Sequence, residues 1–178
     1  ESLTLIPVYR RITAGVEIER DSASSLSYTD GDWGPSTSKF GEESMVTKSA
    51  YFQNHLKLFE RIFAIAGVRA SDHEEFGNHV TYQLSGSVKI PFIESRIKGN
   101  YATGYRTPSL YQLYAPTYGN RELDPEESRS YDFGVEQSIF DGRFVVDVVY
   151  FNTRYKNMIG SDAAYKFINV DRYLTDGI

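Results

Sequence analysis

The sequence contains no cysteine and no long apolar run, and each absence narrows the class of protein. Without cysteine the chain forms no disulfide and offers no thiolate ligand to a metal. No apolar stretch approaches the roughly 18 residues that a membrane-spanning helix needs, and the mean hydropathy is −0.42. The net charge of −5 argues against a nucleic-acid-binding protein, which relies on a basic surface.

Aromatic residues, by contrast, are abundant. They make up 15% of the chain, with 14 Tyr and 11 Phe. A tyrosine ring has one apolar and one polar end, so an excess of Tyr over Phe favours boundaries between apolar surroundings and water, including the headgroup level of a membrane. The 178 residues leave room for one ordinary domain.

Apolar and polar residues alternate along most of the chain, which indicates strands with one apolar and one polar face. The clearest case is Val80–Phe92, where Val80, Tyr82 and Leu84 alternate with Thr81 and Gln83. The pattern predicts an all-β protein, an antiparallel up-and-down meander of about eight strands with no helix. Several segments reach the roughly 9–11 residues that a strand needs to cross a membrane. The predicted strands are Arg11–Arg20, Val46–Phe59, Ile62–Asp72, Val80–Phe92, Ile97–Arg106, Ser130–Glu136, Phe144–Tyr155 and Tyr165–Tyr173.

The connections between these strands alternate between short and long. Phe59–Ile62, Phe92–Arg96 and the Asp141-Gly142 pair predict tight turns. Asp21–Ser44 and Thr107–Glu127 predict long loops. Short turns at one end and long loops at the other are typical of a segment of a larger transmembrane β-barrel of the outer-membrane type.

The stretch NYATGYRTPSLYQLYAPTYGNRELDPEESRSYDFGVE, residues 100–136, carries a motif across the second long loop. It resembles the late-barrel signature of TonB-dependent outer-membrane receptors, and its wording is nearest the vitamin B12 and catecholate-siderophore receptors. Asp132 stands where the family usually has Glu. The matching elements are Tyr105-Arg106-Thr107-Pro108, Gly119-Asn120, Leu123-Asp124-Pro125-Glu126 with Ser128, and Phe133-Gly134-Val135-Glu136.

The resemblance implies a barrel segment from the C-terminal half of such a receptor. Residues 1–178 are then a partial barrel, and the plug domain and the remaining strands are absent from it. The whole protein is expected to bind cobalamin or a ferric siderophore in the outer membrane of a Gram-negative bacterium, and to import it with energy from the TonB complex, without a cofactor. Its partners would include membrane lipid, and the segment alone would self-associate through its two open strand edges.

Candidate site residues lie in the loops and on the polar faces. The ligand candidates Trp33, Tyr111, Tyr114, Tyr118 and Arg121 offer rigid rings and one cation; alternatively, Tyr111 and Tyr114 belong to an interfacial girdle. The lumen-facing candidates, expected to contact the plug, are Lys98, Asn100, Arg106, Asp132 and Glu136. Within the loop, Pro108 is expected to end a strand, and Gly119-Asn120 to make a sharp turn with positive φ.

Catalytic and metal-binding patterns are weak. His73 and His79 in HEEFGNH lack the His-Glu-x-x-His spacing, and the segment is expected to be a solvated turn. No nucleophile elbow is present and no carboxylate pair has a partnered base, so an enzyme is not expected. Asp30 and Asp32 are a weak calcium candidate, against the simpler interpretation of a turn with surface carboxylates.

Two other functions fit parts of the pattern. A soluble lipocalin-like ligand-binding barrel would point the apolar faces inward. An outer-membrane enzyme or a simple porin would share the barrel, but an enzyme needs a catalytic cluster and a porin would show passive flux without saturable binding.

Overall fold

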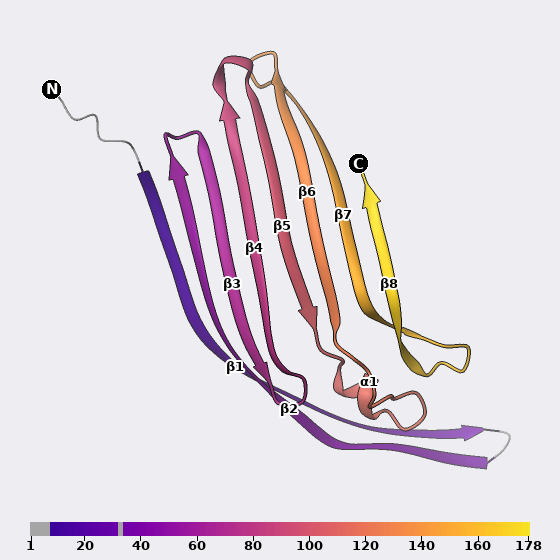
Figure 1. Ribbon diagram of the computed structural model, residues 1–178. Helices are drawn as coiled ribbons and strands as arrows, with labels where there is room; N and C mark the ends of the chain where they lie inside the picture. The colour runs from indigo at the N-terminus through magenta and orange to yellow at the C-terminus, as the bar shows by residue number, and fades with distance from the viewer. Residues whose placement is uncertain (1–7, 32–33) are drawn as a thin grey trace.

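The computed structural model describes residues 8–31 and 34–178 as one antiparallel sheet (Figure 1). The eight strands lie in chain order, each paired with the next, so that β1 and β8 form the two edges. This confirms the predicted all-β meander. The strands are β1 (Val8–Gly31), β2 (Gly34–Leu58), β3 (Ile62–His73), β4 (Gly77–Ile90), β5 (Ser95–Arg106), β6 (Glu126–Ile139), β7 (Phe144–Ser161) and β8 (Phe167–Gly177).

Tight turns join the strands at one end of the sheet, as the sequence predicts. Phe59 and Glu60, between β2 and β3, have φ of 52° and 58°. Phe140 and Asp141, between β6 and β7, both have φ of 55° and are followed by Gly142 at 80°. Non-glycine residues rarely adopt positive φ, but it appears in these short hairpin turns, where Leu58 pairs with Ile62 and Ile139 with Phe144 across three- and four-residue connections.

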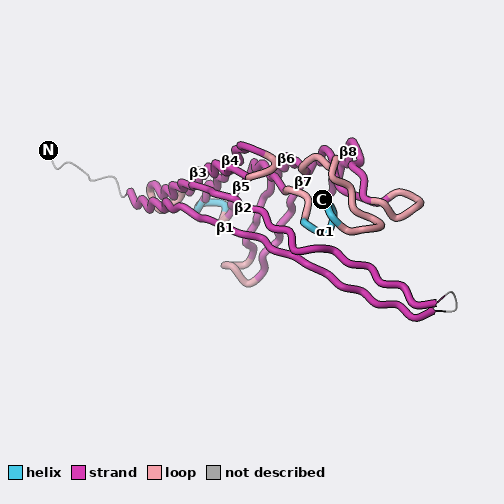
Figure 2. The backbone as a smooth tube through the Cα atoms, turned by 90° about the horizontal axis from the view of Figure 1, so that it is seen from below, coloured by secondary structure: helices cyan, strands magenta, loops and turns pink. Residues whose placement is uncertain are grey.

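The predicted loop Asp21–Ser44 is wrong: β1 and β2 continue through it as a paired hairpin. Pairing extends to Gly31 opposite Gly34, with one register irregularity between Ala23 and Ser25. Figures 1 and 2 show this hairpin projecting past the rest of the sheet. Beyond the neighbouring strands most of its side chains are exposed, with Phe40 as a buried exception, so the segment has little apolar alternation and its sequence does not indicate a strand.

A short helix was also not expected. The helix α1 (Leu110–Tyr114) lies in the β5–β6 connection. Ser109 and Gln112 cap it reciprocally, because the Ser109 hydroxyl accepts from the Gln112 backbone N–H and the Gln112 side chain accepts from the Ser109 backbone N–H. Five residues are too few to show a helical period in the sequence. Neither α1 nor any other helix in the described ranges has the length and apolar character to cross a membrane.

The sheet has two unlike faces. One, here called the apolar face, carries side chains such as Val16 and Leu84, which are 85% and 60% exposed. The other, the polar face, carries Ser85, Asn100 and the residues in register with them on the other strands. Soluble monomers rarely expose apolar surface on this scale, so the molecule has the character of a wall with an unpartnered apolar side. The buried hydrophobic cluster is small and lies at the loop end: Phe40, Met45, Leu110, Leu113 and Leu123.

Candidate functional site

The β5–β6 loop folds into a compact cap at the strand ends. Helix α1 contributes Leu110 and Leu113, and the hairpin strand β2 contributes Phe40 and Met45. Leu113 is only 2% exposed. Pro108, two residues after the last residue of β5, is also fully buried, and the strand ends before it as predicted. The loop is therefore held by its own hydrophobic cluster and by the β1–β2 hairpin.

Tyr114 lies inside this cap. Its ring stacks on Phe40 at 6.4 Å between centroids, and the guanidinium of Arg121 lies 4.7 Å from its centroid. Its hydroxyl donates to the carboxylate of Glu75 at 3.2 Å. Burial, with a contribution from the Glu75 charge, raises the pKa of Tyr114 and so favours the protonated hydroxyl that donates this bond. These contacts give Tyr114 a structural role in the loop.

Tyr111, Tyr118 and Arg121 present their side chains at the surface of the cap. Tyr111 is 48% and Tyr118 39% exposed, although each also touches another ring. Tyr111 packs edge-on against Phe167 at 6.1 Å, and Tyr118 against Tyr165 at 6.4 Å. The loop and the β7–β8 connection thus share one aromatic surface. Trp33 and Asp32, the other two candidates from the hairpin tip, lie outside the described residues.

The expected positive φ at Gly119-Asn120 is wrong, and Gly119 is needed for a different reason. Neither residue adopts positive φ. A Cβ on Gly119 would lie 2.6 Å from the backbone N and O of Ala115. The Gly119 N–H donates to the Ala115 carbonyl at 2.9 Å, and the Asn120 N–H to the Gln112 carbonyl at 2.8 Å. The glycine therefore permits a close approach of two backbone segments.

Two asparagines fasten the loop to the β7–β8 hairpin, and the sequence analysis did not single out either of these contacts. The Asn120 amide donates to the Phe167 carbonyl at 2.9 Å. Asn169 accepts from the Asp124 N–H at 2.8 Å and donates to the carbonyls of Asp124 and Asn157. Glu126 accepts from the Ile159 N–H at 2.7 Å. No local pattern marks Asn169, because its partners are distant in the sequence.

A hollow of about 490 Å³ opens between the cap and the β1–β2 hairpin. Asp21 and Met45 line it from the hairpin, Arg106 lines it from the end of β5, and Ser109, Tyr111 and Gln112 line it from the loop. It combines apolar surface with a cation and hydrogen-bonding groups, as ligand sites do.

The polar face carries a continuous chain of hydrogen bonds. The Gln83 amide donates to the Ser85 hydroxyl at 3.1 Å, which donates to the Asn100 side-chain oxygen at 2.6 Å. The Asn100 amide in turn donates to the Asp132 carboxylate at 3.1 Å. The chain crosses β4, β5 and β6, and it brings two of the lumen-facing candidates into direct contact.

Ion pairs surround this chain on the same face. Lys98 reaches the Asp147 carboxylate at 2.6 Å, passing Gly134, where a Cβ would lie 2.9 Å from the Lys98 Cε. Arg96 pairs with Glu136 at 3.6 Å, and the Arg106–Glu126 pair is at 3.2 Å. All five lumen-facing candidates therefore lie on one face, and all have polar partners there.

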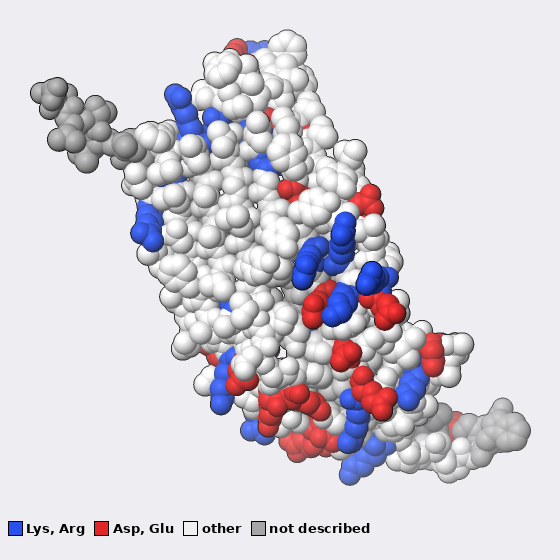
Figure 3. Space-filling model, in the orientation of Figure 1, with Lys and Arg blue, Asp and Glu red and all other residues white. Residues whose placement is uncertain are grey.

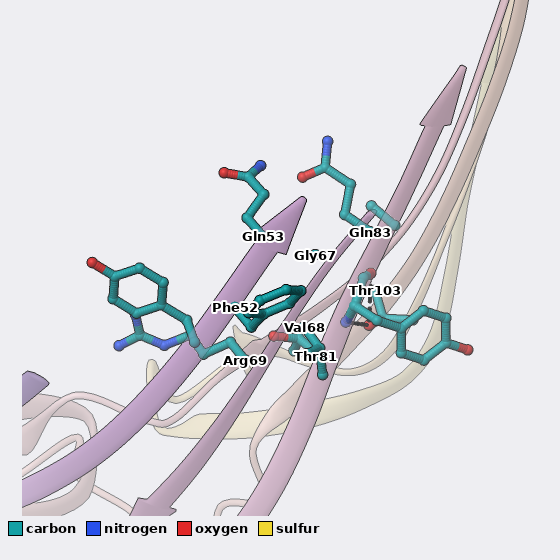
Figure 4. A pocket seen from close by; sticks show the side chains of 11 residues that line it. Phe52, Gln53, Gly67, Val68, Arg69, Thr81, Gln83 and Thr103 are labelled. Carbon is teal, nitrogen blue, oxygen red and sulfur yellow. Dashed lines mark hydrogen bonds between the residues drawn. The ribbon is translucent and has the colours of Figure 1, made fainter. Parts of the chain in front are cut away.

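Further along the polar face a hollow of about 230 Å³ surrounds Gly67 (Figure 4). The side chains of Gln53 and Gln83 stand on the same side of the strands, beside Gly67. Arg69 donates to the Ser49 hydroxyl and to the Glu17 carboxylate, both at 3.0 Å. Because Gly67 has no side chain, the two glutamine side chains line an open hollow at this face.

The histidines have structural contacts. His73 is 4% exposed, and its Nδ1 accepts from the backbone N–H groups of Glu75 and Phe76. The expected solvated cluster is thus wrong for His73, which caps the turn from inside. His79 stacks on Tyr105 at 3.7 Å. Over residues 8–31 and 34–178, no three acidic or histidine side chains gather as a metal site would require. Asp30 lies opposite Pro35 near the hairpin tip.

Long strands, short turns at one end, an anchored loop cap at the other and an exposed apolar face define the wall of a large up-and-down β-barrel. The family model of the TonB-dependent receptor-like β-barrel matches residues 4–178. The chain belongs to this family, as the loop motif indicated.

Curated relatives include vitamin B12 transporters. BtuB of Vibrio vulnificus (strain YJ016) is 26% identical over 174 residues, which cover 94% of this chain and 26% of the relative. BtuB of Vibrio cholerae serotype O1 (strain M66-2) is 32% identical over 107 residues, covering 53% of this chain and 17% of the relative. The chain thus spans about a quarter of the length of the Vibrio vulnificus relative.

Among solved structures, the siderophore receptor PirA from Pseudomonas aeruginosa superposes with a TM-score of 0.78 at 21% identity. The match covers 98% of this chain and 33% of that receptor. At this identity the likeness establishes the fold, and it agrees with the family assignment.

Proposed function

We propose that this chain forms part of the barrel wall and outer surface of a receptor that binds cobalamin or a ferric siderophore and imports it with energy from the TonB complex. The observation that carries the proposal is the anchored cap at the loop end, which holds Tyr111, Tyr118 and Arg121 at the surface of a family barrel. The named relatives are transporters and receptors rather than enzymes, which supports a binding role.

The chemistry of the cap suits such ligands. The corrin macrocycle is large and nearly flat, and each catechol ring of a catecholate siderophore is planar, so these ring faces can stack on tyrosines that are already held in place. Arg121 adds a cation for an anionic metal chelate, and the hollow beside Arg106 and Tyr111 adds depth. A fixed surface loses little conformational entropy on binding.

The polar face has the features of a surface that meets a second protein part. We infer that Lys98, Asn100, Arg106, Asp132 and Glu136 line the lumen and contact the plug of the whole receptor. In support, this face carries a network of charged and polar side chains, among them Asn100 with Asp132 and Lys98 with Asp147. Polar and charged side chains on one face suit contact with a second polar protein surface.

Uptake tests the function. In cells that lack the native receptor gene, the full-length receptor should restore saturable uptake of radiolabelled cobalamin or of a ferric siderophore, and inactivation of TonB should abolish it. The variant Y111A/Y118A/R121A should bind its ligand about ten- to hundredfold more weakly, since buried aromatic and arginine contacts dominate binding energies.

The double variant Y9A/R11A is the control, because Tyr9 and Arg11 lie at the opposite end of the sheet. Its affinity should stay within about twofold of the parent. Uptake that rises linearly with concentration and does not depend on TonB would indicate a porin instead of a receptor. An equal loss of affinity in both variants would mean that the cap is not the ligand-binding surface.

The location of the apolar face is tested by spin labels at Leu84→Cys and Ser85→Cys in the receptor in lipid vesicles. We expect the Leu84 label to collide more with oxygen, which partitions into lipid, and the Ser85 label more with a water-soluble nickel complex. The physical reason is that adjacent residues of a strand point to opposite faces. A Leu84 label shielded from both reagents, beside a Ser85 label that still collides with the nickel complex, would support the soluble lipocalin-like barrel, whose apolar side chains point inward.

A further inference from the structure

A cluster of cations lies on the apolar face near the loop end of β6, β7 and β8. We call it the basic cluster, and it consists of Arg129, Arg154, Lys156 and Arg172. All four side chains are exposed. Figure 3 shows the blue group over the lower half of these strands, whereas the face above it is largely white.

The strand register sets these cations directly against one another. Arg129 of β6 pairs with Arg154 of β7, and Lys156 of β7 pairs with Arg172 of β8. Directly paired residues have Cβ atoms roughly 4.5–5.5 Å apart, and like charges in such pairs destabilise a sheet. Two adjacent pairs of this kind are an arrangement that an anion would stabilise.

The carboxylates nearby do not balance the cluster. Glu127 lies 4.0 Å from the Lys156 Nζ, and Asp176 follows opposite Asn152 on β8. Four cations thus face two carboxylates. Arg129, Arg154 and Arg172 have no ion-pair partner within 4.0 Å in the part of the chain that the structure describes, so their guanidinium groups are available to a ligand.

An aromatic band lies next to the basic cluster on the side away from the loops. Tyr131 is two residues after Arg129 along β6, and its ring is 6.2 Å from that of Tyr150. Beyond it the same face carries Val135 opposite Val148. The order cation, tyrosine, aliphatic along one face is that of a bilayer leaflet from headgroup to acyl chains.

We propose that the basic cluster binds the phosphate-bearing headgroup of a lipid in the outer leaflet, with the acyl chains of that lipid along the adjoining apolar face. Arginine forks match phosphate oxygens bidentately. The basic cluster adjoins the apolar face, and this favours a lipid over a soluble phosphate. A lipid can place its headgroup on the cations and its acyl chains on the apolar side chains at the same time. The inference rests on the proposed outer-membrane location.

Native mass spectrometry of the full-length receptor tests the proposal, with bisphosphorylated lipid A as the probe and the same lipid after enzymatic removal of its phosphates as the comparison. The parent should bind the phosphorylated form at least about tenfold more tightly. The variant R129Q/R154Q/R172Q should lose that preference. The variant R129K/R154K/R172K should keep most of it, because it preserves the charges and the fold.

The matched control removes three other cations of the same face, as R10Q/R20Q/K48Q. Arg10 donates to Asn54, Arg20 to Ser44, and Lys48 lies opposite Asp72, so each of them already has a polar neighbour. Lipid binding by this control should be unchanged. Equal affinity for the two lipid forms, or an equal loss in the control, would overturn the proposal. Nutrient uptake by the same preparations tests the receptor function separately.

Discussion

Replacing Leu113 by Asp is expected to unfold the loop cap while the barrel wall remains intact. Leu113 is 2% exposed at the centre of the cluster with Leu110 and Leu123. Removing a buried leucine side chain alone costs about 2–5 kcal/mol, and burying a carboxylate in its place adds a desolvation penalty. The free energy of local unfolding of such a cap is smaller than this combined cost, so the variant cap should be unfolded.

Limited proteolysis of the receptor measures the effect. Cleavage within residues 107–125 should become faster by about tenfold or more in the variant, and ligand affinity should fall with it. Thr117→Asp is the control, since Thr117 is an exposed residue of the same loop; its cleavage should match the parent. If Leu113→Asp left the loop resistant to protease, the hydrophobic cluster would not be what holds the cap in place.

The second large effect is expected from Val88→Arg on the apolar face. Val88 is 43% exposed and lies opposite Ile97 and Ile62 in the sheet. An arginine on the lipid side of a barrel strand costs about 2–4 kcal/mol near the bilayer midplane. The free energy of unfolding in lipid vesicles, measured by denaturant titration, should fall by that amount.

Ser87→Arg is the matched control, because the neighbouring residue points to the polar face opposite Phe63 and Lys98. Its cost should be below about 1 kcal/mol, as expected for a partly hydrated site. A larger loss at Ser87 than at Val88 would mean that the apolar face is turned toward protein and that the proposed membrane orientation is inverted.

The strands were predictable where one face is apolar and the other polar. Val80–Phe92 was expected and β4 runs from Gly77 to Ile90; Ile97–Arg106 was expected and β5 begins two residues earlier, at Ser95. The signal is strong there because each residue of a strand meets a different environment from its neighbour. The tight turns were predictable for a related reason, since Asp141-Gly142 suits positive φ.

The same rule fails where most side chains of both faces are exposed, or where the residues in contact are distant in the sequence. The β1–β2 hairpin beyond Asp21 has no clear alternation, although its pairing continues, with one irregularity between Ala23 and Ser25, to Gly31 and Gly34. The helix α1 is shorter than two turns, and only its Ser109 cap marks it locally. Gly119 looked like a turn residue, but its lack of a side chain serves an approach to Ala115 that no local pattern reveals.

The sequence by itself determined the family and most of the strands, with the alternation of side chains between two faces, because alternation and the loop motif are local properties of the chain. The tertiary structure alone decided which side chains meet. Register sets Arg129 against Arg154, and Lys98 within reach of Asp147, while long-range packing brings Tyr114 between Phe40 and Arg121. Such pairings depend on strand neighbours and stagger, which follow from backbone hydrogen bonding across the whole sheet.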